Sequence, residues 1–168
     1  MFDLLYMDLS KEGITPLLER KIRVDMDQLG ITLNGLYKVT HWAEIGIGGR
    51  INSISSKFYI APGDVVLPGQ DFSTDQIWFD PLIVTRVIKR FDGNKWNLGL
   101  LADIGGFGIG SDFTWQLNPF VGYQFSNLFE LNASWRWLGM DYQTGSGASA
   151  FLYDMVISGP QMGLLFHF

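Results

Sequence analysis

The chain has 168 residues, with 17 acidic and 12 basic side chains and a formal net charge of -5, so a nucleic-acid-binding surface is not expected. Apolar residues make up 47% of the sequence, charged residues only 17% and aromatic residues 15%, which excludes disorder and favours a single folded domain over residues 1–168. The chain contains no cysteine, which excludes disulfide frameworks, thiolate zinc sites and cysteine nucleophiles.

Apolar residues recur at every second position through most of the chain, and this period is typical of β-strands. The alternation is clearest in 96–104, 115–125 and 129–137. We expect eight strands, at residues 2–10, 21–39, 42–57, 77–91, 95–107, 113–126, 129–143 and 150–168.

The connections between these strands alternate between two sizes. Tight turns are expected at 40–41, 92–94 and 127–128, and longer connections at 11–20, 58–76, 108–112 and 144–149. Antiparallel strands alternate in direction, so every short turn falls at one end of the sheet. Short turns at one end and long loops at the other are typical of bacterial outer-membrane barrels.

The pattern also fits a soluble barrel or sandwich that buries its apolar face and exposes its polar face to water. Two features favour a transmembrane barrel instead. The polar face is made of Gly, Asn, Gln, Ser and Thr with few charges, which suits a narrow, filled interior. Aromatic residues near the strand ends would form girdles at the lipid interfaces; these are Trp78, Trp96, Trp115, Phe129 and Trp135. Because hydrocarbon cannot satisfy an open sheet edge, we expect an all-β, closed antiparallel up-and-down transmembrane barrel.

Four segments carry a family resemblance: D-I-G-G-F-G-I-G-S-D-F-T-W-Q at 103–116, V-G-Y-Q-F-S at 121–126, W-R-W-L-G-M-D-Y at 135–142 and S-G-P-Q-M-G-L-L-F-H-F at 158–168. Together they resemble the C-terminal half of a widespread, mostly uncharacterised family of small bacterial outer-membrane β-barrel proteins. The resemblance implies this fold and an outer-membrane location, but no reaction. In similar sequences a further hairpin often precedes the segment resembling 4–10, which would give ten strands.

The end of the chain resembles a targeting signal. Phe166 and Phe168 close an alternating strand, and this ending is similar to the signal that the outer-membrane insertion machinery reads. The resemblance therefore adds that machinery to the expected partners, which are the lipid bilayer and lipopolysaccharide.

Several charged residues fall on the inward parity of the expected strands. They are Asp8, Glu44, Arg50, Asp80, Arg86, Arg90, Asp103, Glu130, Arg136 and His167. A narrow barrel has to neutralise each buried charge, so the first interpretation is a lumenal ion-pair network. The alternative is a selective path for an ion or small solute, lined by the arginines.

Catalysis is not expected. The two histidines, His41 and His167, both fall at the short-turn end, so a Ser–His pair facing the outer leaflet is not available to a lipid-modifying enzyme. Asp25 and Asp27 alternate on one face and could bind a divalent cation beside lipopolysaccharide, or simply project into water. The Gly-rich run 105–110 is followed by a strand, not a helix, which excludes a phosphate-binding loop. No cofactor or metal is predicted.

The long connection 58–76 is the best candidate for a protein partner, because it carries a run of apolar residues around Pro and Gly breaks. The sequence therefore predicts an outer-membrane barrel with a structural or interaction role, such as an accessory subunit of an envelope complex. The alternatives are a narrow channel for small solutes and, in third place, an outer-leaflet lipid-modifying enzyme.

Overall fold

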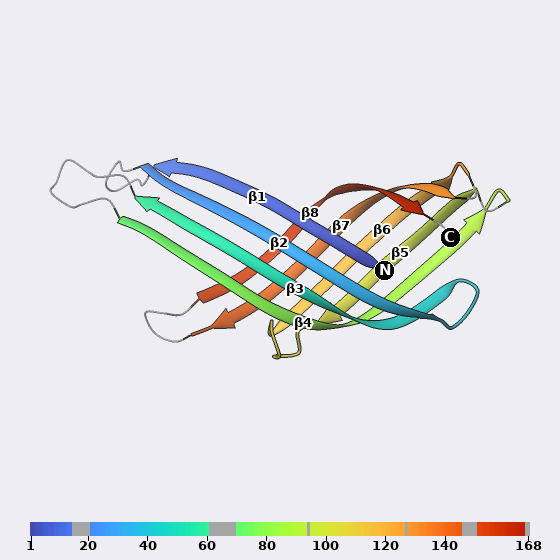
Figure 1. Ribbon diagram of the computed structural model, residues 1–168, viewed down its shortest axis with the longest axis horizontal. Helices are drawn as coiled ribbons and strands as arrows, with labels where there is room; N and C mark the ends of the chain where they lie inside the picture. The colour runs from blue at the N-terminus through green and yellow to red at the C-terminus, as the bar shows by residue number, and fades with distance from the viewer. Residues whose placement is uncertain (15–20, 61–69, 94, 127, 146–150, 167–168) are drawn as a thin grey trace. The chain divides into compact units, whose positions relative to one another are not determined.

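The computed structural model describes residues 1–14, 21–60, 70–93, 95–126, 128–145 and 151–166. Every regular element in these ranges is a β-strand. The strands are β1 (Phe2–Ile14), β2 (Lys21–Lys38), β3 (Ala43–Ile60), β4 (Gln70–Phe91), β5 (Trp96–Gly105), β6 (Phe113–Gln124), β7 (Phe129–Thr144) and β8 (Phe151–Phe166). They form one antiparallel sheet in the order of the chain, β1 to β8 (Figure 1). The expected eight-stranded, up-and-down, all-β fold is confirmed.

The strands on either side of the predicted connection 58–76 are longer than expected. β3 continues to Ile60, and β4 already begins at Gln70, so 58–60 and 70–76 belong to strands and 61–69 lies outside the described residues. The polar residues of 70–76 gave no clear alternation. Strand pairing supplies backbone hydrogen bonds whatever the side chains are, so a long strand can extend through such a segment.

The chain divides into two compact units. The first unit comprises Met1, Leu33–Gly49 and Phe79–Phe168, and the second comprises Phe2–Thr32 and Arg50–Trp78. The first unit contains the complete β5, β6, β7 and β8 and the C-terminal part of β4, which pair in sequence order (Figure 1).

The two faces of the sheet differ in burial along every strand of the first unit. In β5 the exposed Leu98 and Leu100 alternate with the buried Asn97 and Leu101. In β6 the same alternation continues, with Asn118 buried. A small apolar cluster lies on the buried face, where Leu36 packs against Leu82, Val84 and Leu101. Polar side chains occupy most of the remaining buried positions that the structure describes.

Candidate functional site

The distribution of buried and exposed side chains is inverted relative to a protein that folds in water. Among the described residues, 36 large apolar side chains are exposed and only nine are buried, whereas 15 polar or charged side chains are buried. Soluble proteins bury most of their large apolar residues and leave charged ones outside. Exposed apolar patches larger than a few hundred Å² mark sites of contact with another protein, a ligand or a membrane.

The register of the first unit arranges the exposed apolar residues in rows that cross the sheet. The row through Trp96 contains Phe91, Trp96, Tyr123, Leu131 and Leu164. Four residues further along β5, the row through Leu100 contains Val87, Leu100 and Pro119. The register of β6 and β7 on either side of Pro119 continues this row to Trp135 and Pro160. The row through Ile104 contains the exposed Ile83, Ile104 and Val156 and the half-buried Trp115, whose ring lies against the buried Gly139. These three rows contain no charged side chain, and the row through Leu98, between the first two, contains Lys89.

The apolar face has a defined limit at each end of the first unit. Beyond the Ile104 row, Phe113 pairs with Asp141, which pairs with Asp154, and both carboxylates are exposed. At the opposite end the rings of Trp96 and Tyr123 lie 4.7 Å apart. The face therefore consists of an apolar band between a row of carboxylates and a row of aromatic rings.

In the second unit the face formed by Tyr6, Asp8, Ser10, Asp25 and Asp27 is polar. The Tyr6 hydroxyl donates to Asp27 Oδ1 at 3.5 Å, and the Ser10 hydroxyl donates to Asp25 Oδ1 at 2.7 Å. Asp8 is exposed and shares the parity of Tyr6 and Ser10, so the prediction that it faces inward is wrong. Apolar residues occur at both parities of this segment, and pairing with β2 decides which face is buried.

The expected interface aromatics do not all lie on the exposed face. Trp96 and Trp135 are exposed, and Trp115 and Phe129 are half-buried. Trp78 is only 6% exposed, so its placement at a lipid interface is wrong. It has the same parity as the buried Asp80, and in the run 77–79 all three residues are apolar, so the sequence could not settle which of them faces outward.

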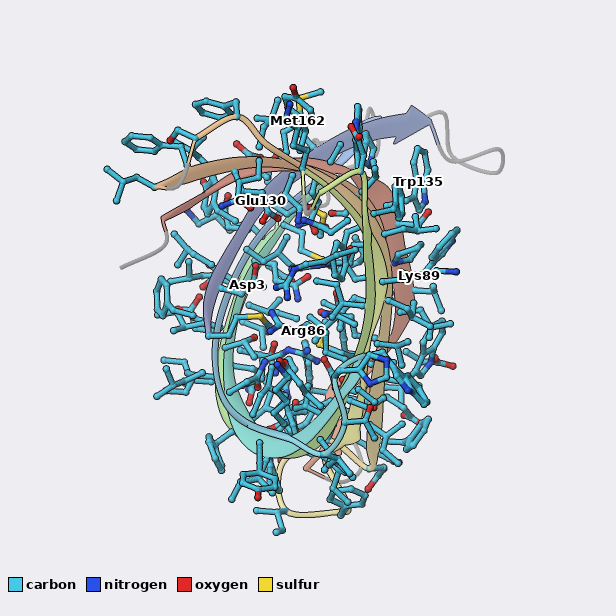
Figure 2. All side chains as sticks on the ribbon, turned by 90° about the vertical axis from the view of Figure 1, so that its right-hand side faces the viewer. Asp3, Arg86, Lys89, Glu130, Trp135 and Met162 are labelled. Atoms are coloured by element: carbon cyan, nitrogen blue, oxygen red, sulfur yellow. The ribbon has the colours of Figure 1, made fainter. Side chains whose placement is uncertain are left out.

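Figure 2 shows the two faces of the first unit through its labelled side chains. Arg86 and Glu130 lie on one side of the ribbon, whereas Lys89, Trp135 and Met162 lie on the other. The first side is the buried polar face and the second is the exposed apolar face.

Two of the predicted lumen charges form an ion pair across β3 and β4. Glu44 Oε2 accepts hydrogen bonds from Arg86 Nη2 at 2.6 Å and from Arg86 Nε at 2.8 Å. The side chains of Arg86 and Glu44 are 30% and 18% exposed respectively. Partial burial strengthens the pair relative to one in open water, while the remaining water contact limits its desolvation cost.

The other predicted charges of the network are mostly deeply buried. Arg50 in β3 donates through Nε to the Thr32 hydroxyl at 3.2 Å within the second unit. Asp103 in β5 and Arg136 in β7 are buried within the first unit. Arg90 is exposed at the end of β4, and His167 and Phe168 lie outside the described residues.

Two buried polar side chains lie over Gly122. A Cβ atom at this position would lie 2.5 Å from both Asn97 Nδ2 and Glu130 Oε1. Asn97 and Glu130 are buried, and both side chains occupy the space that a Cβ atom at Gly122 would fill. The small residues of the polar face therefore make room for longer polar side chains that fill it.

Asp80 is held in part by hydrogen bonds from a loop. It is completely buried, and its carboxylate accepts hydrogen bonds from the Ser111 backbone N–H at 2.6 Å and from the Ser111 hydroxyl at 3.0 Å. Ser111 belongs to the connection between β5 and β6. Asp80, predicted as a lumen charge, thus holds the loop between β5 and β6 in place. The sequence did not indicate this role.

The same loop contains a strained turn. The Ile109 N–H donates to the Gly106 carbonyl at 2.9 Å, and the two central residues, Phe107 and Gly108, have φ values of 51° and 72°. This is the pattern of a type I′ turn, which favours Asn, Asp or Gly at both central positions. A bulky L-residue in the left-handed region costs about 1–2 kcal/mol. The signal in the sequence was the glycine run around Phe107.

Metal-ligand clusters and membrane-spanning helices are absent from the part of the chain that the structure describes. No group of three or more His, Asp or Glu side chains there could hold a metal ion. No helix in those ranges is long and apolar enough to cross a bilayer. His41 is exposed.

Comparison of the chain with protein-family models, with curated proteins and with solved structures finds no match. The functional argument therefore depends on the geometry of the two faces.

Proposed function

We propose that the chain forms a closed eight-stranded β-barrel in the bacterial outer membrane, as a member of the small-barrel family that its C-terminal half resembles. The observation that carries this proposal is the inverted burial, with polar residues inside and large apolar residues exposed. Lipid chains are the neighbour that makes such an apolar surface stable. Closure follows from the same environment, since an open strand edge in hydrocarbon would leave backbone groups unsatisfied.

The dimensions of the apolar band support this environment. β5 has 10 residues, which extend about 33 Å at 3.3 Å per residue. A strand tilted by about 45° then spans about 23 Å of membrane thickness, close to the apolar band of about 25 Å in outer-membrane barrels. The paired Trp96 and Tyr123 rings lie at one edge of this band, as interfacial aromatics do.

One charge on the exposed face is compatible with lipid. Lys89 pairs with Leu98, two residues from the end of β4 at Phe91. A lysine this close to the strand end can bury its aliphatic part and extend its ammonium group to the interface.

The role we propose is structural or interactive and not enzymatic, for example as an accessory subunit of an envelope complex. The support is a buried face occupied by polar side chains, such as Asn97 and Glu130 over Gly122, and the ion pair between Glu44 and Arg86. Eight strands leave an interior just wide enough for side chains. Its surroundings would be the bilayer and lipopolysaccharide, after delivery by the insertion machinery.

A series of arginine substitutions on the exposed face tests the membrane assignment. Leu100, in the central row, and Leu128, in the turn before β7, are both exposed. In water, Leu100→Arg would change stability by no more than about 0.5 kcal/mol. In a bilayer it should cost about 2–4 kcal/mol, and Leu128→Arg about 0–1 kcal/mol.

The measurement is urea unfolding of protein refolded into dimyristoylphosphatidylcholine vesicles, followed by tryptophan fluorescence. Leu98→Arg, between the two positions, should give an intermediate cost. Equal and small effects at all three positions would contradict the proposal, as would a chain that stays monodisperse without detergent.

A further inference from the structure

The loop between β5 and β6 is held in one conformation by buried groups. Asp80 binds both the N–H and the hydroxyl of Ser111, and the Gly106 N–H donates to the Pro81 carbonyl at 3.1 Å. A Cβ atom at Gly106 would lie 2.5 Å from the Ser111 carbonyl oxygen. These contacts leave the loop 106–112 little freedom.

This fixed loop presents two apolar side chains outward. Phe107 is 52% exposed and Ile109 is 73% exposed. Phe107 occupies the left-handed region, where Asn or Gly would be unstrained. A strained bulky residue that remains largely exposed adds little to the stability of the fold. Such a residue points to a function, here a contact of Phe107 with something outside the chain.

The exposed face of the sheet continues into this loop. Ile104 precedes the loop and Phe113 follows it, and both are exposed. β5 and β6, with 10 and 12 residues, are shorter than β7 and β8, with 16 residues each. Because β5 is just long enough to cross the apolar band, its loop emerges where the hydrocarbon ends, while longer strands continue into water.

We propose that the β5–β6 loop inserts into the outer leaflet, with Phe107 and Ile109 among the lipid headgroups and the first segments of the acyl chains. This inference rests on the membrane assignment made above. Lipid is the occupant because the two side chains continue an apolar surface that already needs lipid contact. The exposed Asp112 and Asp141 beside it limit insertion to the interface.

The absence of cysteine makes a direct depth measurement simple, because each single-cysteine variant carries one label. Ile109→Cys, Leu100→Cys and Lys95→Cys, each with a nitroxide label, are reconstituted into dimyristoylphosphatidylcholine vesicles. Power saturation then compares collisions with oxygen, which is enriched in lipid, and with a nickel chelate, which is enriched in water. We expect the oxygen-to-nickel ratio to be highest at 100, lowest at 95, and at 109 closer to that at 100.

The controls separate this inference from the membrane assignment. A water-like ratio at both 100 and 109 would refute the membrane assignment, and the loop inference with it. A lipid-like ratio at 100 with a ratio at 109 closer to that at 95 would overturn the loop inference alone. If Ile109→Cys does not fold, Phe107→Cys reports on the same turn.

A second pair of variants tests the contribution of Phe107. On the Ile109→Cys background, Phe107→Asn keeps the turn but removes the apolar ring, and should lower the ratio at 109 severalfold. Phe107→Leu keeps an apolar side chain and should leave the ratio nearly unchanged. Equal ratios in the two variants would show that Phe107 does not hold the loop in the lipid.

Discussion

Replacement of Asp80 by Ala should destabilise the protein strongly, although Asp80 is buried and does not itself contact lipid in the proposed arrangement. Its carboxylate is completely buried and accepts two hydrogen bonds from Ser111, which is itself completely buried. A hydrogen bond to a charged group contributes about 1.5–3 kcal/mol, and a buried donor without an acceptor costs about 1–3 kcal/mol. Asp80→Ala should therefore lower the free energy of unfolding by about 3–5 kcal/mol.

Two further variants divide this effect between the bonds. Asp80→Asn keeps one carbonyl oxygen for the Ser111 N–H and should cost about 1–2 kcal/mol, since one neutral hydrogen bond replaces a charged one. Ser111→Ala removes only the bond from the hydroxyl and should cost about 1 kcal/mol. In a double-mutant cycle the losses from Asp80→Ala and Ser111→Ala should not add, because they share one contact.

The assay is urea unfolding in dimyristoylphosphatidylcholine vesicles, with the slope of the transition checked for each variant. A loss below about 1 kcal/mol for Asp80→Ala would refute the reasoning, because it would mean that water replaces the carboxylate at Ser111. Full additivity with Ser111→Ala would refute it as well.

The remaining predictions concern the buried polar face. Arg86→Ala and Glu44→Ala should each lower the free energy of unfolding by about 1–2 kcal/mol, because the ion pair is only partly exposed. In a double-mutant cycle the two losses should be coupled, and additive losses would contradict an ion pair. Gly122→Ala should cost about 1–3 kcal/mol by thermal or urea unfolding, because its Cβ would displace two buried polar side chains. Gly163→Ala, with no atom within 4 Å of the new Cβ, is the matched control and should be nearly neutral. Planar-bilayer recordings of the purified protein should show no discrete conductance, and a stable open level whose ion selectivity changes in Arg86→Ala would favour a channel instead.

The number and approximate positions of the strands could be predicted, because they depend on local sequence patterns. Alternation in 96–137 identified the strands, and the turn residues identified the short connections at 40–41 and 92–94. The alternation of side chains along a strand involves only residues that are neighbours in sequence. It can therefore be recognised without knowing which strands pair with each other.

Where both parities of a strand are apolar, the sequence was a poor guide to its faces. Asp8 was assigned to the buried face and Trp78 to the exposed face, whereas Asp8 is exposed and Trp78 is buried. A shift of one residue in pairing exchanges the two faces of a strand, so the neighbouring strand decides what is buried.

The identity of interacting partners lay beyond the sequence as well. Several of the charges predicted to face inward are buried, but their partners were not predicted. Glu44 pairs with Arg86 across 42 positions in the chain, and Asp80 meets Ser111 across 31 positions. Which charge meets which group depends on the register between strands. Register is fixed by turn geometry and by packing over the whole sheet, and not by the residues adjacent in the chain.

The amino-acid sequence by itself determined that this protein is a sheet of eight strands with one apolar and one polar face, because side-chain direction alternates along any extended backbone. Only the tertiary structure decided that the polar face is the buried one in the first unit, and that a buried carboxylate fixes a strained loop with Phe107 at its tip. Burial and hydrogen-bond partners depend on which strands become neighbours, and that choice is made by the folded sheet as a whole.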